Sequence, residues 1–323
     1  MIRSLRRFAG AALAALLVGG GAAHAQFPDR AVRIVVPSTA GGTADILARE
    51  LGQRLAEAWG KPVVIENKPG GLGVVGAEAL ARAAPDGYTL AMLPSNHAIN
   101  PIVMKDLPYD TFRDFAPVAV VAIAPGLLVV NPALDANNAK AAFDLAKASP
   151  GKYSYGSPVP LTAGHRSMEL LKQAAGVDIR HVPYKGGAQA VTDTMGGHVQ
   201  FLIISIPSVI GQVKAGKLKA LGVTTQKRFE GLPDIPTLAE SGFAGFESVE
   251  WYGLFAPAGV PPAIIEKISA DTQRVLREAS LRDRMIALGA IAAPGGPRDL
   301  EKMLRGEYDR WVRLAPVVKL QAD

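Results

Sequence analysis

Cysteine is absent from this 323-residue sequence, and aromatic residues make up only 6% of it. Without cysteine the chain can have no disulfide framework, no thiolate nucleophile and no Cys-ligated zinc or iron–sulfur centre. After residue 25, no apolar run approaches the ~20 residues that a membrane-spanning helix needs. A content of 49% hydrophobic and 20% charged residues is that of a globular protein, and the length suits two domains.

The first 25 residues have the three zones of a secretory signal peptide. A basic start with three arginines is followed by the apolar run 8–18 and by small residues that end at Ala25. The apolar run is too short for a membrane anchor, which is the alternative interpretation. We therefore expect residues 1–25 to be a signal peptide cleaved near Ala25, and Arg6-Arg7 leaves twin-arginine export open beside the Sec route.

The formal net charge of the chain depends strongly on this segment. Its removal takes away three arginines and no acidic residue, which lowers the net charge from +6 to +3. The remaining sequence has no lysine or arginine tract and no interleaving of basic with aromatic residues. We therefore expect no nucleic-acid partner.

Short β-rich runs alternate with helical periodicity along most of the chain, which predicts an α/β fold with mainly parallel sheets flanked by helices. The helix expected over 44–59 has Leu47, Leu51 and Leu55 on one stripe, and Gly60 lies just past its end. The expected strands are 32–36, 63–66, 89–93, 127–130, 200–205, 218–224 and 251–255.

The chain contains no linker that would cut it into consecutive domains, so we expect a discontinuous arrangement. Residues 26–124 and 226–323 would form the first lobe, and residues 125–225 the second. Helices expected over 262–277, 280–288 and 297–314 would pack on the first lobe. Two α/β lobes that face each other create a cleft lined by strand ends and helix N-termini.

A Gly-Gly loop lies between the first expected strand and the first expected helix. Gly41 and Gly42 have no side chains, so backbone N–H groups can approach a ligand, and a helix start favours an anion such as a carboxylate. The hydroxyls of Thr39 and Thr43 could support it. The same residues also fit an ordinary turn, with Thr43 as the helix N-cap and Asp45 favourable in the first turn.

Two segments of the second lobe repeat this pattern. The expected helix after Ser157 starts at Thr162 or Ala163, which is again a terminus that favours an anion. A strand, a polar turn and a helix also follow one another around Lys185, whose side chain could neutralise an anion. An exposed turn lysine is the commoner case.

Motifs for catalysis and cofactors are scarce. The run Gly71-Leu72-Gly73-Val74-Val75-Gly76 matches G-x-G-x-x-G, but no strand directly precedes it and no acidic residue ends the next strand, so we expect no dinucleotide cofactor. The sequence has no G-x-S-x-G, P-loop or H-E-x-x-H motif, and we expect neither a metal nor any other cofactor. Ser95 and His97 follow a strand that ends at the expected cleft and could contact a ligand. A secreted α/β hydrolase is therefore an alternative, with a catalytic triad whose residues lie far apart in the sequence.

The sequence resembles the Bug family, the TctC-like periplasmic receptors of tripartite tricarboxylate transporters. The resemblance covers essentially the whole mature chain. It rests on the segments VRIVVPSTAGGTADILAR, ENKPGG, AAPDGYTL, HVPYKGGAQAVTD, LPDIPTLAESG and WYGLFAPAGVP.

This resemblance implies a two-lobed Venus-flytrap receptor in the periplasm. Such a receptor is no enzyme; it closes on a small carboxylate and passes it to integral-membrane transporter subunits. We expect the protein to be a monomer. Signalling to a membrane sensor is an alternative that the sequence cannot separate from transport. The expected ligand-binding residues are Ser38, Thr39, Ala40, Gly41, Gly42, Thr43, Asp45, Ser95, His97, Ser157, Thr162, Ala163, Lys185 and Ser205.

Three departures from the family pattern bear on the ligand. The family commonly has an aromatic residue in place of Ser38, a polar turn in place of Pro158-Val159-Pro160, and an Asp-Asn pair near Ile204-Ser205. With fewer polar side chains at these positions, a polar group of the ligand would have no hydrogen-bond partner. Each such unpaired group would cost ~1–3 kcal/mol of binding free energy. We therefore hypothesise a ligand with a carboxylate at one end and a less polar body.

Overall fold

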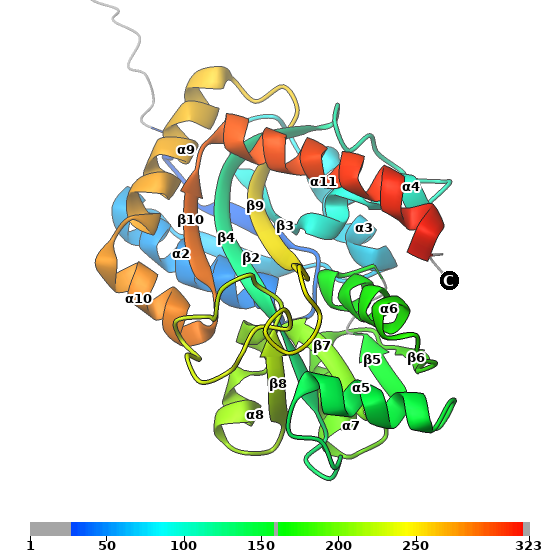
Figure 1. The fold of residues 1–323 in the computed structure, drawn as a ribbon. Coiled ribbons are helices and arrows are strands. Elements are labelled where there is room, and N and C mark those ends of the chain that lie inside the picture. Colours follow the sequence, from blue (N-terminus) through cyan, green and yellow to red (C-terminus); the bar gives the residue numbers. More distant parts are fainter. Residues whose placement is uncertain (1–26, 158–160, 319–323) are drawn as a thin grey trace, which may run out of the picture.

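The computed structural model describes residues 27–157 and 161–318 of the chain (Figure 1). The expected signal peptide over 1–25 and the segment Pro158-Val159-Pro160 lie outside the described residues. Within the described ranges, no helix combines the length and the apolar character needed to cross a membrane.

Strands and helices alternate along the chain, as the sequence predicts. The first part of the chain contains β1 (Val32–Val36), α2 (Thr43–Trp59), β2 (Val63–Asn67), η1 (Gly71–Gly73), α3 (Val74–Ala81), β3 (Thr89–Pro94), η2 (Ser95–Ala98), α4 (Asn100–Val103) and β4 (Phe115–Val130). The middle part contains α5 (Ala139–Ala148), β5 (Ser154–Ser157), α6 (Ala163–Ala175), β6 (Arg180–Pro183), α7 (Gly187–Met195), β7 (Phe201–Ser205), η3 (Ile206–Ser208), α8 (Ile210–Lys214) and β8 (Lys219–Val223). The last part contains β9 (Val249–Pro257), α9 (Pro262–Leu276), α10 (Ala279–Leu288), β10 (Ile291–Gly295) and α11 (Pro297–Val318).

Strand β4 runs through the whole molecule and joins its two parts (Figure 1). Its residues Phe115–Pro125 pair with β9, and its last residues Gly126–Val130 pair with β7. We call the β2-β1-β3-β9-β10 side, with the first stretch of β4, the upper part. The lower part is the β8-β7-β5-β6 side with the end of β4.

The sheet is mixed rather than mainly parallel. Strand β1 pairs in parallel with β2 and β3, and β5 pairs in parallel with β6 and β7, as βαβ units require. Strand β4 pairs antiparallel with each of β7, β8, β9 and β10, and β9 pairs antiparallel with β3. The expected parallel pairing is therefore confirmed for β1 with β2 and β3 and for β5 with β6 and β7. It is wrong for every pairing of β4 and β9.

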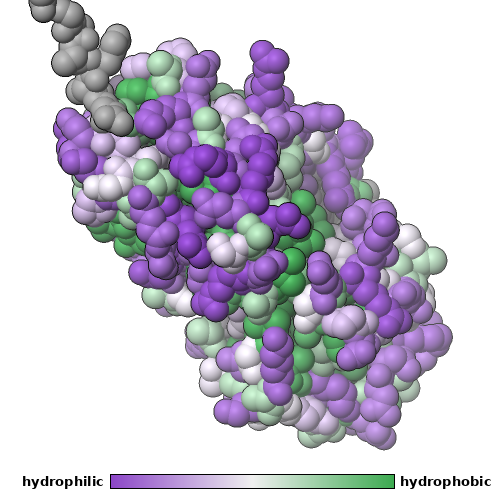
Figure 2. Space-filling view, turned by 90° about the vertical axis from the view of Figure 1, so that its left-hand side faces the viewer, coloured by the Kyte–Doolittle hydropathy of each residue, from purple (hydrophilic) through white to green (hydrophobic). Residues whose placement is uncertain are grey.

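Each part has helices on both faces of its sheet. In the upper part, Leu47, Leu51 and Leu55 of α2 pack with α9 and α10 on one face, and α3 and α11 cover the other. In the lower part, α5 and α6 cover one face, and α7 and α8 the other. Figure 2 shows hydrophobic side chains gathered on one side of the molecule where the two parts meet.

Gly164 illustrates how closely a helix and a strand approach in the lower part. A Cβ atom added to Gly164 in α6 would lie 2.0 Å from the backbone oxygen of Ile203 in β7. We expect Gly164→Ala to lower the free energy of unfolding by about 3 kcal/mol, because helix and strand must move apart. Urea unfolding measures this loss. Gly211→Ala in α8 is the control, since its Cβ would meet nothing within 4 Å, and an equal loss in both variants would contradict the argument.

Candidate functional site

The loop between β1 and α2 ends in a helix start that no side chain caps. Gly42 is the N-cap residue, with φ −73° and ψ 161°, and it makes no side-chain capping bond because glycine has no side chain. The first N–H groups of any α-helix have no partner inside the helix. Together with the helix dipole, they form a site for the negative charge of a carboxylate.

Asp45 holds this loop in place through contacts with its neighbours. Its carboxylate accepts hydrogen bonds from Gly41 N–H (3.0 Å) and from Asn67 Nδ2 (3.0 Å), and it pairs with Arg49 Nη2 (2.8 Å). Burial alone would raise the pKa of Asp45, but the hydrogen bonds from Arg49, Gly41 and Asn67 outweigh burial and lower it. Asn67 also donates to the Ser38 carbonyl oxygen (3.0 Å), so Asp45 and Asn67 together brace the loop.

The remaining residues of the loop lie beside the lower part. Thr39 and Ala40 are exposed, and the Ser38 hydroxyl oxygen is buried without a hydrogen-bond partner among the described residues. A Cβ added to Gly186 would lie 3.0 Å from Thr39 Oγ1, so the turn before α7 contacts the loop. Lys185 is exposed on that turn.

Hydroxyl groups from the two parts meet at the start of α2. Thr43 Oγ1 and Ser208 Oγ are 2.9 Å apart, and the Tyr252 phenol lies beside Thr43 and Ser205. Burial, with Glu250 nearby, raises the pKa of Tyr252, which therefore stays neutral. Ile204, where the family commonly has a polar residue, packs in the core of the lower part. Its side chain therefore does not face these hydroxyl groups.

Thr43 and Ser205 are among the site residues expected from the sequence, whereas Ser208 and Tyr252 are not. The signal for Tyr252 was alternation along the strand 251–255, which places it on the face opposite Trp251. Nothing in the sequence placed that face against the start of α2.

The start of α6 is bonded to a carboxylate of the protein itself. Glu250 in β9 accepts hydrogen bonds from Ala163 N–H (3.0 Å) and from the N–H (3.1 Å) and hydroxyl of Ser95. Its side chain is buried, and the residue is only 4% exposed. Ser95 and Ala163, which we expected to contact the ligand, are therefore engaged with Glu250, while Thr162 is the N-cap residue of α6.

A buried arginine lies next to this glutamate. Arg166 Nη2 donates to Ser95 Oγ (3.2 Å) and pairs with Glu307 Oε1 (3.0 Å), and the guanidinium lies 4.9 Å from the Trp311 ring centre. Burial lowers the pKa of Arg166, while Glu307 and Glu250 oppose this shift. Neither Arg166 nor Glu250 is among the residues expected from the sequence, because neither belongs to a short motif.

Ser95 and His97 do not form a nucleophile–base pair. Ser95 is bonded to Glu250, and both ring nitrogens of His97 are buried without a partner among the described residues. Burial lowers the pKa of His97 to about 3. The Ser157 hydroxyl instead hydrogen-bonds with His181 Nε2 (2.7 Å), and the His181 ring stacks on His165.

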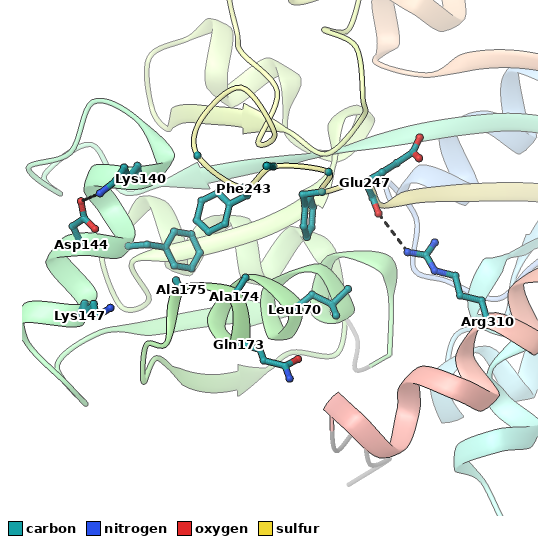
Figure 3. A pocket seen from close by; sticks show the side chains of 15 residues that line it. Lys140, Asp144, Lys147, Leu170, Gln173, Ala174, Ala175, Phe243, Glu247 and Arg310 are labelled. Carbon is teal, nitrogen blue, oxygen red and sulfur yellow. Dashed lines mark hydrogen bonds and ion pairs between the residues drawn. The ribbon is translucent and has the colours of Figure 1, made fainter.

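Two further observations limit the chemistry of the described residues. Residues 27–157 and 161–318 contain no group of three His, Cys, Asp or Glu side chains placed to hold a metal ion. A groove of about 630 Å³ lies between α5, α6 and the segment 242–247, with Arg310 at one end (Figure 3). It contains none of the expected site residues, so it is separate from the α2 start.

The fold is that of periplasmic solute-binding proteins. It has two α/β parts joined by one long strand, and a braced helix start lies at their junction. The chain belongs to the tripartite tricarboxylate transporter family receptors (TctC), whose pattern it matches over residues 47–320. BugT of Bordetella pertussis is 32% identical over 287 residues, covering 88% of both chains. These findings confirm the resemblance seen in the sequence.

Solved structures of relatives have the same fold. Rpa4515 of R. palustris with adipate matches with a TM-score of 0.89 at 35% identity, over 91% of this chain and 99% of that one. MatC from Rhodopseudomonas palustris with bound malate matches with a TM-score of 0.82 at 30% identity, over 89% and 99%.

Proposed function

We propose that this protein captures a small carboxylate between its upper and lower parts and delivers it to the membrane subunits of a tripartite tricarboxylate-type transporter. The observation that carries the proposal is the braced start of α2, which lies at the contact between the upper and lower parts. Relatives with bound adipate and malate support a carboxylate ligand. The protein would act in the periplasm as a monomer, after loss of residues 1–25, and it would not be an enzyme.

The proposed cycle is closure of two lobes around the ligand. The first lobe would comprise residues 26–124 and 226–323, and the second residues 125–225. The carboxylate would bind at the α2 start, and donors of the second lobe, such as Ser205 and Ser208, would complete its surroundings only on closure. A ligand that bridges the lobes shifts an open–closed equilibrium towards the closed form.

A thermal-shift screen of the mature protein tests the proposal. A ligand that binds only the folded state raises the unfolding midpoint, by about 2.7 kcal/mol of added stability at a concentration 100 times its Kd. We expect a clear shift with small carboxylates and none with their amides. The absence of a shift with every mono-, di- and tricarboxylate would contradict the proposal.

The Thr43→Val variant tests the contact between the two parts. Valine has nearly the shape of threonine but cannot bond to Ser208 or Tyr252, so we expect affinity for the carboxylate found in the screen to fall about tenfold. Isothermal titration calorimetry measures the change. Thr272→Val is the control, because the hydroxyl of Thr272 has no partner among the described residues. Equal affinities of the two variants would count against closure through Thr43.

A further inference from the structure

Glu250 fills the second position in the molecule where a ligand carboxylate could bind. Its two carboxylate oxygens accept three hydrogen bonds, from Ala163 N–H at the α6 start and from the N–H and hydroxyl of Ser95. Ser95 lies in the upper part and Ala163 in the lower. A ligand carboxylate that bridged the two parts would accept the same hydrogen bonds. Here the carboxylate belongs to the protein itself, because Glu250 is a residue of β9.

The charge of Glu250 has no direct cation partner in the described structure. Arg166 reaches Ser95 Oγ and Glu307, so its guanidinium is one hydrogen bond removed from Glu250. The carboxylate is stabilised by neutral donors and a helix start instead. A second carboxylate brought to this place would meet the negative charge of Glu250, which Arg166 offsets only from a distance, in a region of low dielectric constant where like charges repel strongly.

Glu250 also lies close to the proposed carboxylate position at the start of α2. Glu250 and Tyr252 are two residues apart in β9, so they share one face of the strand with their Cα atoms ~7 Å apart. Tyr252 contacts Thr43, the first residue of α2. A short dicarboxylate bound at the α2 start therefore reaches towards Glu250 with its other end.

We infer that Glu250 is a specificity-determining residue that restricts the ligand to a single carboxylate with an uncharged far end. This inference rests on the proposed function and names the substrate class of the same site. A monocarboxylate uses the α2 start and leaves Glu250 bonded to Ser95 and Ala163. A dicarboxylate must either displace Glu250 or place a second charge beside it.

Isothermal titration calorimetry with two matched pairs of acids tests the inference. The pairs are adipate with monomethyl adipate, and succinate with monomethyl succinate, which differ by one charge at nearly equal length. We expect the wild-type protein to bind at least one monoester about tenfold or more tightly than its diacid. Glu250→Gln should reduce that ratio by about tenfold, mainly through tighter binding of the diacid.

Glu307→Gln is the control, because Glu307 belongs to the same buried cluster but bonds to Arg166 and Trp311 rather than to a helix start. Its ratio should equal that of the wild type. Tighter wild-type binding of both diacids would overturn the inference, and this arm needs no variant to fold. Equal changes of the ratio in the two variants would also overturn it. Failure of the proposed function gives a different result, in which none of the four acids binds any of the proteins.

Discussion

Gly42→Asp is expected to remove carboxylate binding, with a loss of affinity of about 100-fold or more. The conformation of Gly42, with φ −73° and ψ 161°, suits aspartate as an N-cap residue. The new carboxylate would accept the helical N–H groups at the α2 start and place a negative charge where the ligand carboxylate belongs. Each charge-assisted hydrogen bond lost to the ligand is worth about 1.5–3 kcal/mol, and every 1.4 kcal/mol is tenfold in affinity.

The free protein should tolerate this change. A Cβ at position 42 lies 3.3 Å from the Thr39 carbonyl oxygen and 3.4 Å from Ser38 Oγ, which requires only a small shift. A charged cap at a helix start adds about 0.3–1 kcal/mol of stability. Gly42→Asn is the matched control, since it has the same size without the charge and should bind the ligand about tenfold more tightly than Gly42→Asp. Wild-type affinity in Gly42→Asp would place the ligand elsewhere.

The second large effect is a loss of stability in acid caused by His97. The ring centre of His97 lies 4.6 Å from that of Phe115 and 5.6 Å from that of Phe255, in a site without hydrogen bonds to the ring nitrogens among the described residues. Burial lowers its pKa in the folded protein from 6.5 to about 3. Well above pH 6.5 the ring is neutral in both the folded and the unfolded state, so it has no effect on stability there.

Between pH 6.5 and about 3 the unfolded chain takes up a proton that the folded protein does not, so stability falls as the pH falls. The loss approaches about 1.4 kcal/mol per pH unit below pH 6 and amounts to about 2.3 kcal/mol between pH 6.5 and 4.5. His97→Leu should remove this loss, and urea unfolding at both pH values measures it. His198→Leu, at an exposed histidine, is the control. An acid loss in His97→Leu as large as in the wild type would exclude His97 as its source.

The sequence predicted α2 and its loop well because their signals are local. The stripe of Leu47, Leu51 and Leu55 has helical spacing, and Gly60 ends the helix in the left-handed conformation with φ 62°. The same segment, VRIVVPSTAGGTADILAR, is one of those that carry the family resemblance. Such features depend on neighbours within a few positions of the chain.

The extent of β4 and the role of Glu250 could not be predicted, because both depend on distant residues. Pro117, Pro125 and Gly126 interrupt the strand pattern, and the structure accommodates Pro117 beside an irregularity in the β4–β9 pairing. The sequence does show that Glu250 is a charged residue next to the apolar strand segment 251–255. Its partners, Ser95 and Ala163, lie 155 and 87 positions away, and no local pattern brings them together.

The long strand β4 has a consequence for how the protein folds. Its upper stretch is paired by β9 and β10, which end at Pro257 and Gly295, so the centre of the upper sheet cannot form before almost the whole chain is available. Pairings across such sequence separations make folding slow. A nascent chain would therefore remain without its central sheet for most of its synthesis, and it would stay in a form that an export machinery can thread.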